Sequence, residues 1–216
     1  MVNVRAKRKP SSAANALDDA TSGKQPSRRD EIIAISAQCF AQYGFEATAI
    51  REIADRANIL SGSLYHHFVS KNEILHSLMR PFCAMLVARY SEFQKSRDDV
   101  DTTLAKLIRF SGEGFLDNIY IPTIYHNNFK FFERNEEFGY TVECSKLIKK
   151  VWFDLVQRGI ETGYFRPDVD CEIVSRMLLK LVATSAGDRV NSPEAVDTLV
   201  ADHMDLIRHS LCKRPS

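Results

Sequence analysis

The segment from Thr48 to Leu75 most constrains the fold of this chain, because it spells two short helices around a tight turn and then the start of a third. Asn58 can adopt the left-handed conformation that ends the first of these helices. In the second helix, expected from residue 61 to 68, Leu64 and Phe68 are spaced to face inward. The first helix is predicted from apolar residues that recur at i, i+3, i+4 and i+7, namely Ile50, Ile53, Ala54 and Ala57.

The other faces of the second short helix carry small or planar polar groups. Gly62 lets the backbone come close to another surface. Ser70 and Glu73 have the spacing of a capping box, which predicts that a longer helix begins there. A short helix with such a polar outer face is typical of a helix-turn-helix that enters a groove of DNA. The polar groups are Ser61, Ser63, Tyr65, His66 and His67.

The run TAIREIADRANILSGSLYHHFVSKNEIL resembles the DNA-binding segment of the TetR family of transcriptional regulators. The resemblance is close over the N-terminal third of the chain, where five residues stand in register behind the helix-turn-helix: Tyr65, His67, Phe68, Ser70 and Lys71. It departs from the family at Asn58, where Gly is usual, and at Leu60, where Ser is frequent. The operator sequence of relatives is therefore not carried over to this chain.

The chemistry of these side chains predicts which of them contact DNA. Serine hydroxyls can donate to or accept from base edges, and Leu60 can touch a thymine methyl group. Tyrosine, histidine, threonine and lysine offer donors suited to phosphate oxygens. Two alternatives to DNA contact remain open. Thr48 can be a helix cap without touching DNA, and Lys71 can be a solvated surface charge. The predicted DNA-binding residues are Thr48, Leu60, Ser61, Gly62, Ser63, Tyr65, His66 and Lys71.

Positive charge is concentrated near this segment. Before Asp30 seven basic residues stand against two acidic ones, whereas the whole chain has a formal net charge of +1. Residues 1–26 are rich in Ser, Ala, Lys and Pro without apolar periodicity, so we expect a disordered basic extension there. Such an extension can attract phosphates or can simply keep the protein in solution.

The rest of the chain predicts an all-α fold, because no convincing period-2 alternation occurs. We expect a helix-turn-helix DNA-binding domain at 27–75, a linker helix at 70–93 with a kink or break at Pro81, and a ligand-binding and dimerisation domain at 76–216. Besides the linker, long helices are expected at 27–43, 101–117, 119–135, 137–163, 170–188 and 192–212.

The middle of the chain is rich in aromatic residues, which either pack as a helical core or line an apolar ligand pocket. The family resemblance implies a pocket, since TetR-like regulators hold an inducer in their C-terminal helical domain. The candidate lining residues are Phe115, Tyr120, Tyr125, Phe129, Phe132 and Trp152. The last two helices carry wide apolar stripes, and the resemblance implies that they pair with a second copy of the chain.

Together these features predict a homodimeric repressor that a small molecule releases from a palindromic operator. An activator and a helical adaptor without specific DNA binding are the alternatives. The segments ILSGSLYHHF and VWFDLVQRGIETGYFRPDVD are similar to a TetR subgroup that controls lipid and steroid breakdown and responds to acyl-coenzyme A thioesters. The chain departs from the steroid-responsive relatives at Leu179 and Ala183, where these relatives carry an Arg and a Trp. Cations that could meet the coenzyme A phosphates are Lys146, Lys149, Lys150 and Arg158.

Several classes of protein are disfavoured by the sequence. No run reaches the 18 or more apolar residues of a membrane span, and the first residues lack the apolar stretch of a secretory signal, so we expect a cytoplasmic protein. The five cysteines are scattered without a C-x-x-C pair, so we expect neither a disulfide framework nor a metal site. No G-x-S-x-G, phosphate-binding glycine loop or H-E-x-x-H motif occurs, so we expect no enzyme activity and no cofactor.

Overall fold

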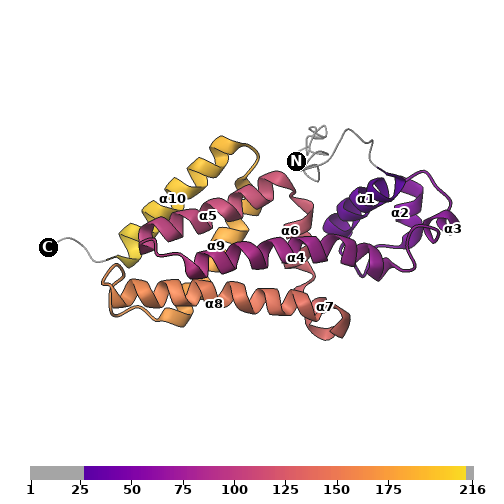
Figure 1. Ribbon diagram of the computed structural model, residues 1–216. Helices are drawn as coiled ribbons and strands as arrows, with labels where there is room; N and C mark the ends of the chain where they lie inside the picture. Colours follow the sequence, from indigo (N-terminus) through magenta and orange to yellow (C-terminus); the bar gives the residue numbers. More distant parts are fainter. Residues whose placement is uncertain (1–26, 213–216) are drawn as a thin grey trace, which may run out of the picture.

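The computed structural model describes residues 27–212, and within them it has ten α-helices, one 3-10 helix and no β-strand (Figure 1). The predicted all-α fold is confirmed. The expected extension at 1–26 lies outside the described residues. Among the described helices, none has the length and apolar character needed to cross a lipid bilayer.

Three helices form a head at one end of the molecule: α1 (Arg28–Tyr43), α2 (Ile50–Arg56) and α3 (Ser61–Leu64) (Figure 1). Gly44 ends α1 with φ of 85°, and Asn58 follows α2 with φ of 54°, both in the left-handed region. The helices pack around fully buried side chains, including Ile32, Phe40, Ile53, Leu64 and Phe68.

The head is joined to the rest of the molecule by α4 (Lys71–Lys95). The Ser70 hydroxyl accepts a hydrogen bond from the Glu73 amide at 3.2 Å, and the Glu73 carboxylate reaches back to the Val69 amide at 2.6 Å. The expected break at Pro81 is absent, because α4 continues through this residue. Pro81 has no amide hydrogen, so only the helical hydrogen bond to the Ser77 carbonyl, four residues earlier, is lost there.

The body contains six further α-helices and a 3-10 helix. The prediction of one helix over 119–135 is wrong, since the chain breaks at Asn128 with φ of −106° and ψ of 16°. The elements are α5 (Val100–Asp117), α6 (Tyr120–Asn127), α7 (Phe129–Arg134), η1 (Glu136–Phe138), α8 (Gly139–Glu161), α9 (Cys171–Arg189) and α10 (Pro193–Leu211).

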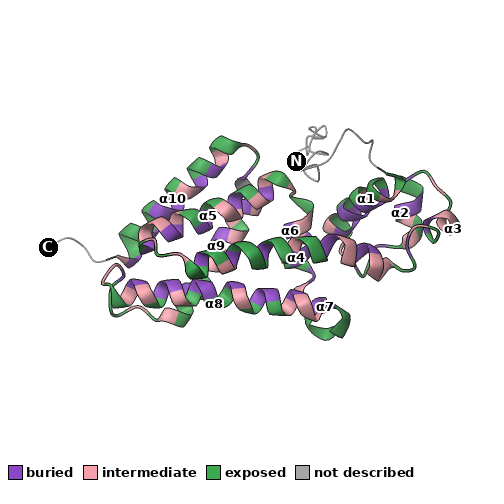
Figure 2. Cartoon of the chain, viewed as in Figure 1, coloured by how far each residue is buried: buried purple, intermediate pink, exposed green. Residues whose placement is uncertain are grey.

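The helices of the body pack around one apolar interior. In Figure 1, α8 runs beside α4, and α5 lies against α10. Buried residues follow the inner faces of these helices, whereas exposed residues cover their outer faces (Figure 2). The largest fully buried side chains of the body are Phe132, Phe138, Trp152 and Phe165.

Candidate functional site

The surface of the head is formed at its tip by α3 and the residues that flank it (Figure 1). Leu64 is fully buried and fixes the short helix to the head. Leu60 is 80% exposed, Tyr65 is 57% exposed, and Gly62 and His66 are also exposed. Ser61 and Ser63 are half-buried. Six of the eight predicted DNA-binding residues therefore reach one short stretch of surface, which we call the α3 surface, comprising residues 60–63, 65 and 66.

The other two predicted residues are engaged inside the head. Thr48 is only 1% exposed, and its hydroxyl donates to the Gly44 carbonyl at 2.7 Å. The Lys71 ammonium donates to the carbonyls of Phe45 at 2.8 Å and Thr48 at 2.9 Å, and it lies 4.5 Å from the centre of the Phe45 ring. Burial lowers the pKa of Lys71. Both side chains hold the loop between α1 and α2, and contact with phosphates stays a prediction for them.

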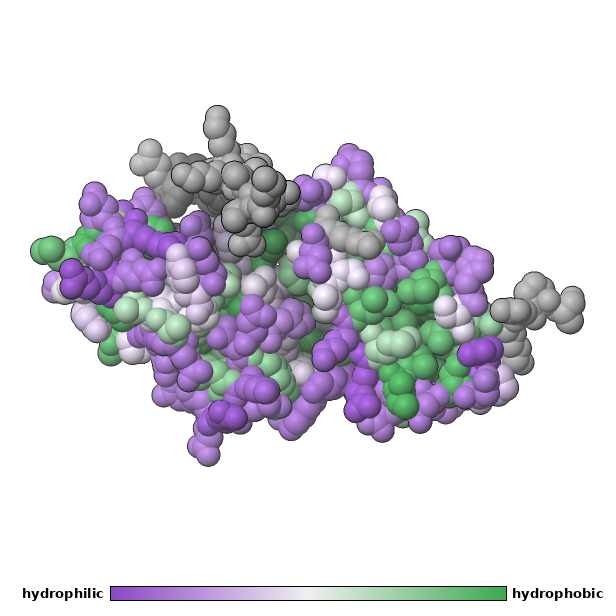
Figure 3. All heavy atoms as spheres, turned by 180° about the vertical axis from the view of Figure 1, so that it is seen from behind, coloured by the Kyte–Doolittle hydropathy of each residue, from purple (hydrophilic) through white to green (hydrophobic). Residues whose placement is uncertain are grey.

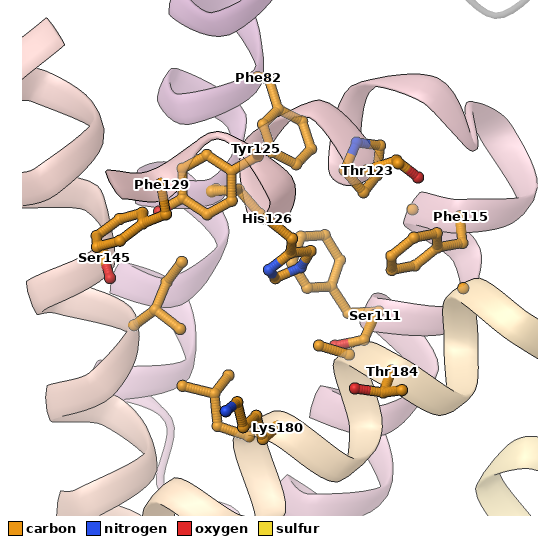
Figure 4. Close-up of a pocket in the computed structure, with 18 of the residues that line it drawn as sticks. Phe82, Ser111, Phe115, Thr123, Tyr125, His126, Phe129, Ser145, Lys180 and Thr184 are labelled. Carbon is orange, nitrogen blue, oxygen red and sulfur yellow. The ribbon is translucent and has the colours of Figure 1, made fainter. Parts of the chain in front are cut away.

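A cavity of about 550 Å³ lies in the body, lined by residues of α4, α5, α6, α8 and α9 and by the first residue of α7. Figure 4 shows side chains from these helices around an open space, with His126 reaching into it. Of the predicted pocket residues, Phe115, Tyr125 and Phe129 line the cavity. Tyr120 is outside its wall and partly exposed, whereas Phe132 and Trp152 are buried in the packing behind it.

The sequence prediction missed the wall that α4 contributes and part of the wall that α5 contributes. Phe82, Leu86 and Tyr90 line the cavity at successive turns of α4, and Phe110 and Ser111 face it from α5. The i, i+4, i+8 stripe on α4 was a usable signal. It was not distinctive, because a helix that only packs against a core has the same spacing.

Positive charge reaches the cavity at two places. Lys149 lies in the wall with its ammonium 5.4 Å from the centre of the Phe129 ring, and Lys180 lies in the wall on α9. The other expected cations point elsewhere: Lys146 pairs with Glu143, Lys150 with Asp154, and Arg158 donates to the Thr103 hydroxyl. One of the four cations that the sequence suggested for phosphates is therefore at the cavity.

The segment that lines the cavity between α6 and α7 also touches the head. The side-chain oxygen of Asn128 accepts a hydrogen bond from the Phe45 amide at 3.1 Å, and its amide donates to the Ile124 carbonyl at 2.8 Å. The Phe45 and Phe131 rings lie 4.9 Å apart. Residues on both sides of Asn128 line the cavity, namely Asn127 and Phe129. A change in the cavity wall can therefore reach the loop that Lys71 and Thr48 hold.

The last two helices leave apolar side chains in solvent. Ile173 on α9 is 58% exposed, Met177 on α9 is 47% exposed, and Leu206 on α10 is 51% exposed. In Figure 3, hydrophobic surface gathers toward the end of the molecule opposite the head. Large exposed side chains of this kind are typical of a surface that another protein chain covers.

Comparison with known proteins gives a consistent result. Residues 32–78 match the family described as bacterial regulatory proteins, tetR family. The HTH-type transcriptional repressor KstR2 of Mycobacterium tuberculosis is 40% identical over 166 residues, which are 74% of this chain and 80% of that protein. KstR2 of Rhodococcus jostii is 34% identical over 194 residues, which are 89% of this chain and 95% of that protein.

A solved structure has a similar fold. The ketosteroid transcriptional regulator KstR2 of Mycobacterium tuberculosis aligns with a TM-score of 0.78 and 34% sequence identity, over 89% of this chain and 99% of that chain. The similarity extends well beyond the head, so the arrangement of head, α4 and body is common to both proteins.

Proposed function

Because this chain belongs to the TetR family of bacterial regulatory proteins, we propose that it is a homodimeric transcriptional repressor that a small molecule releases from a palindromic operator. The observation that carries the proposal is the α3 surface. It presents hydroxyl, imidazole and backbone groups to solvent at the tip of the head, while the apolar side chains of the head are buried in its core. The relatives named as repressors support the direction of regulation.

The α3 surface contacts bases and phosphates in the major groove. Ser61 and Ser63 read base edges, and Leu60 meets a thymine methyl group. Tyr65 and His66 bind phosphates and fix the position of the helix. Because α3 has only four residues, one head contacts few base pairs, and two heads related by a two-fold axis read both halves of a palindrome.

The exposed apolar side chains of α9 and α10 form the dimer interface. Ile173, Met177 and Leu206 become buried when the two helices pair with their copies in a four-helix arrangement. Covering these side chains removes apolar surface from water, which is the main driving force for such an association.

The effector binds in the cavity, and an acyl-coenzyme A thioester is the favoured class. The aromatic wall suits an acyl group, while Lys149 and Lys180 offer positive charge for phosphates. The relative whose structure is described as a ketosteroid transcriptional regulator supports an acyl group derived from a lipid or steroid. Binding favours a spacing of the two heads that does not fit adjacent major grooves, and this lowers the affinity for DNA.

Fluorescence anisotropy tests the proposal. The purified protein is titrated onto labelled DNA from upstream of its own gene, with unrelated DNA as a control and at two salt concentrations. Tight, sequence-selective binding that acyl-coenzyme A thioesters reverse supports the proposal. Weak and unselective binding that modest salt abolishes contradicts it and favours a helical adaptor.

A matched pair of variants makes this test specific for the α3 surface. His66→Glu places a negative charge on that surface and should weaken binding to the operator by about tenfold or more. Gln94→Glu adds the same charge at an exposed position of α4 in the body and should change the affinity by less than about twofold. Equal effects of the two substitutions contradict the assignment of the DNA-binding surface.

A further inference from the structure

The His126 side chain lines the cavity and points from α6 into its open space (Figure 4). It stays exposed there, so its ring is open to a molecule that enters. Burial nevertheless lowers the pKa of His126, because the surrounding walls displace water that would hydrate a charged ring. The imidazole is therefore neutral at pH 7 and keeps one N–H in either tautomer.

The ring of His126 touches other rings but makes no hydrogen bond within residues 27–212. It is nearly parallel to the Phe115 ring, with the two centres 6.3 Å apart, and its centre lies 5.6 Å from that of Tyr125. The Tyr125 hydroxyl is already engaged, because it donates to the Thr141 carbonyl at 3.2 Å. Only His126, among these three rings, has hydrogen-bonding groups that the protein leaves unused.

These rings belong to a series of contacts that ends at a cation. The centres of the Tyr125 and Phe129 rings lie 6.1 Å apart, and the Lys149 ammonium lies 5.4 Å from the centre of the Phe129 ring. The series therefore connects an apolar end, at Phe115, with a cationic end, at Lys149. Between these two ends, the N–H of His126 is a neutral donor without an acceptor.

Two other neutral donors of the cavity wall are already used. The Ser111 hydroxyl donates to the Leu107 carbonyl at 3.0 Å, and the Thr123 hydroxyl donates to the Ile119 carbonyl at 2.6 Å. A hydroxyl has one proton, so neither side chain can donate to a ligand without giving up the bond to its own helix. His126 can do so at no such cost.

An acyl-coenzyme A thioester has the same order of groups as this series of contacts. Its acyl chain is apolar, its phosphates are anionic, and the thioester carbonyl between them is neutral and only accepts hydrogen bonds. A carbonyl oxygen that leaves water without finding a donor is destabilised, so the wall that covers the acyl group needs a donor. The N–H of His126 meets this need without placing a charge against the acyl group.

We propose that the imidazole N–H of His126 donates a hydrogen bond to the thioester carbonyl of the effector and so holds the acyl group against the aromatic wall of the cavity. His126 is then a specificity-determining residue, with a role different from that of the cations, which meet phosphates. This inference rests on the proposed function, because it takes an acyl-coenzyme A thioester as the effector.

Two probes that differ only in the carbonyl test the contact. Octanoyl-coenzyme A is titrated into the full-length protein without DNA in a calorimeter. S-octyl-coenzyme A, a thioether in which a methylene replaces the carbonyl, is titrated in the same way. The thioester should bind about three- to tenfold more tightly than the thioether, which is the effect of one hydrogen bond in a shielded site.

Three variants assign this preference to one side chain. His126→Leu removes the N–H, so the two probes should bind equally, while the affinity for the thioether should change by less than about twofold. His126→Gln keeps a donor and should retain part of the preference. Asn127→Ala removes a neighbouring polar side chain of the same wall and should leave the preference unchanged. Binding of the thioether also shows that each variant is folded.

Equal affinities of the unaltered protein for the two probes would overturn the contact, and so would a preference that His126→Leu keeps. Equal losses of affinity for both probes in His126→Leu would also overturn it, because His126 would then only shape the wall. Fluorescence anisotropy with operator DNA separates this failure from that of the proposed function. If both probes release the DNA equally well, the effector class stands and the contact falls; if neither probe binds, both fall.

Discussion

Replacing Asn128 by alanine should loosen the contact between the cavity wall and the head. The side chain of Asn128 makes two hydrogen bonds and is 8% exposed. The Ile124 carbonyl keeps a partner after the substitution, because it also accepts from the backbone amide of Asn128 at 3.1 Å. The Phe45 amide does not, and Phe45 is itself buried. A buried amide without an acceptor costs about 1–3 kcal/mol, so we expect a loss of about 2 kcal/mol in the free energy of unfolding.

Two measurements check this magnitude. Urea unfolding, followed by the fluorescence of Trp152, gives the change in the free energy of unfolding. It is measured at several protein concentrations, because association of two chains also stabilises the folded state. Hydrogen exchange at the Phe45 amide reports the bond itself. A loss of about 2 kcal/mol corresponds to exchange that is about 30-fold faster when the amide opens and recloses many times before each exchange event.

Asn127→Ala provides the matched control. Asn127 is the neighbouring residue of the same type and is exposed, so its replacement should change stability by less than about 0.5 kcal/mol. If Asn128→Ala unfolds at the same urea concentration as the wild type and the Phe45 amide exchanges at an unchanged rate, the reasoning is refuted.

Four further predictions concern other parts of the molecule. Gly159→Ala should lower the free energy of unfolding in urea by about 1–3 kcal/mol, because a Cβ atom there would lie 2.3 Å from the Phe165 ring. Gly139→Ala in the same helix is the control: its Cβ atom would meet nothing within 4 Å, so the free energy of unfolding should hardly change. Gly62→Ala also meets no atom within 4 Å, so unfolding should be unaffected while anisotropy shows weaker DNA binding. Burial lowers the pKa of His76 from its usual 6.5, and Arg80 lowers it further. The stability that neutral His76 contributes is therefore complete above pH 6.5 and is lost as the pH falls through the lower pKa of the folded state. His76→Gln should remove this part of the pH dependence of the midpoint of urea unfolding. A thiol reagent should modify Cys171 and Cys212 in the native protein and reach the buried Cys39, Cys83 and Cys144 only after unfolding, as a cysteine-by-cysteine mass analysis would show.

The head could be predicted from the sequence because local residues determine it. Gly44 and Asn58 take positive φ values that few other residues adopt, and Ser70 caps the helix that follows it. Each of these signals acts within a few residues of the chain, so it can be read without knowledge of the fold.

The break between α6 and α7 could not be predicted in the same way. The side chain that competes with the helix there, Asn128, accepts its hydrogen bond from Phe45, which lies 83 residues earlier in the chain. Pro81 shows the reverse case, since a local signal for a break is overridden by the packing of α4 on both sides of it.

The sequence predicted an aromatic pocket in the body, but only three of its six predicted lining residues line the cavity. Phe115, Tyr125 and Phe129 line it, whereas Phe132 and Trp152 are as aromatic and face the packed interior instead. Composition does not distinguish these two environments. The difference depends on which turn of each helix faces the cavity between six helices, and that is a property of the assembled body.

A single helix, α4, belongs to both halves of the molecule. Ile74 and Leu75 in its first turns are buried with the head, and Phe82 and Tyr90 further along line the cavity. A hybrid that joins the head of one relative to the body of another must therefore cross over inside α4, and the exposed Pro81 lies between the two sets of contacts. Such a hybrid must also take its body from a parent with Asn at position 128, because the backbone amide of residue 45 in the head would otherwise lie at the junction without its hydrogen-bond acceptor.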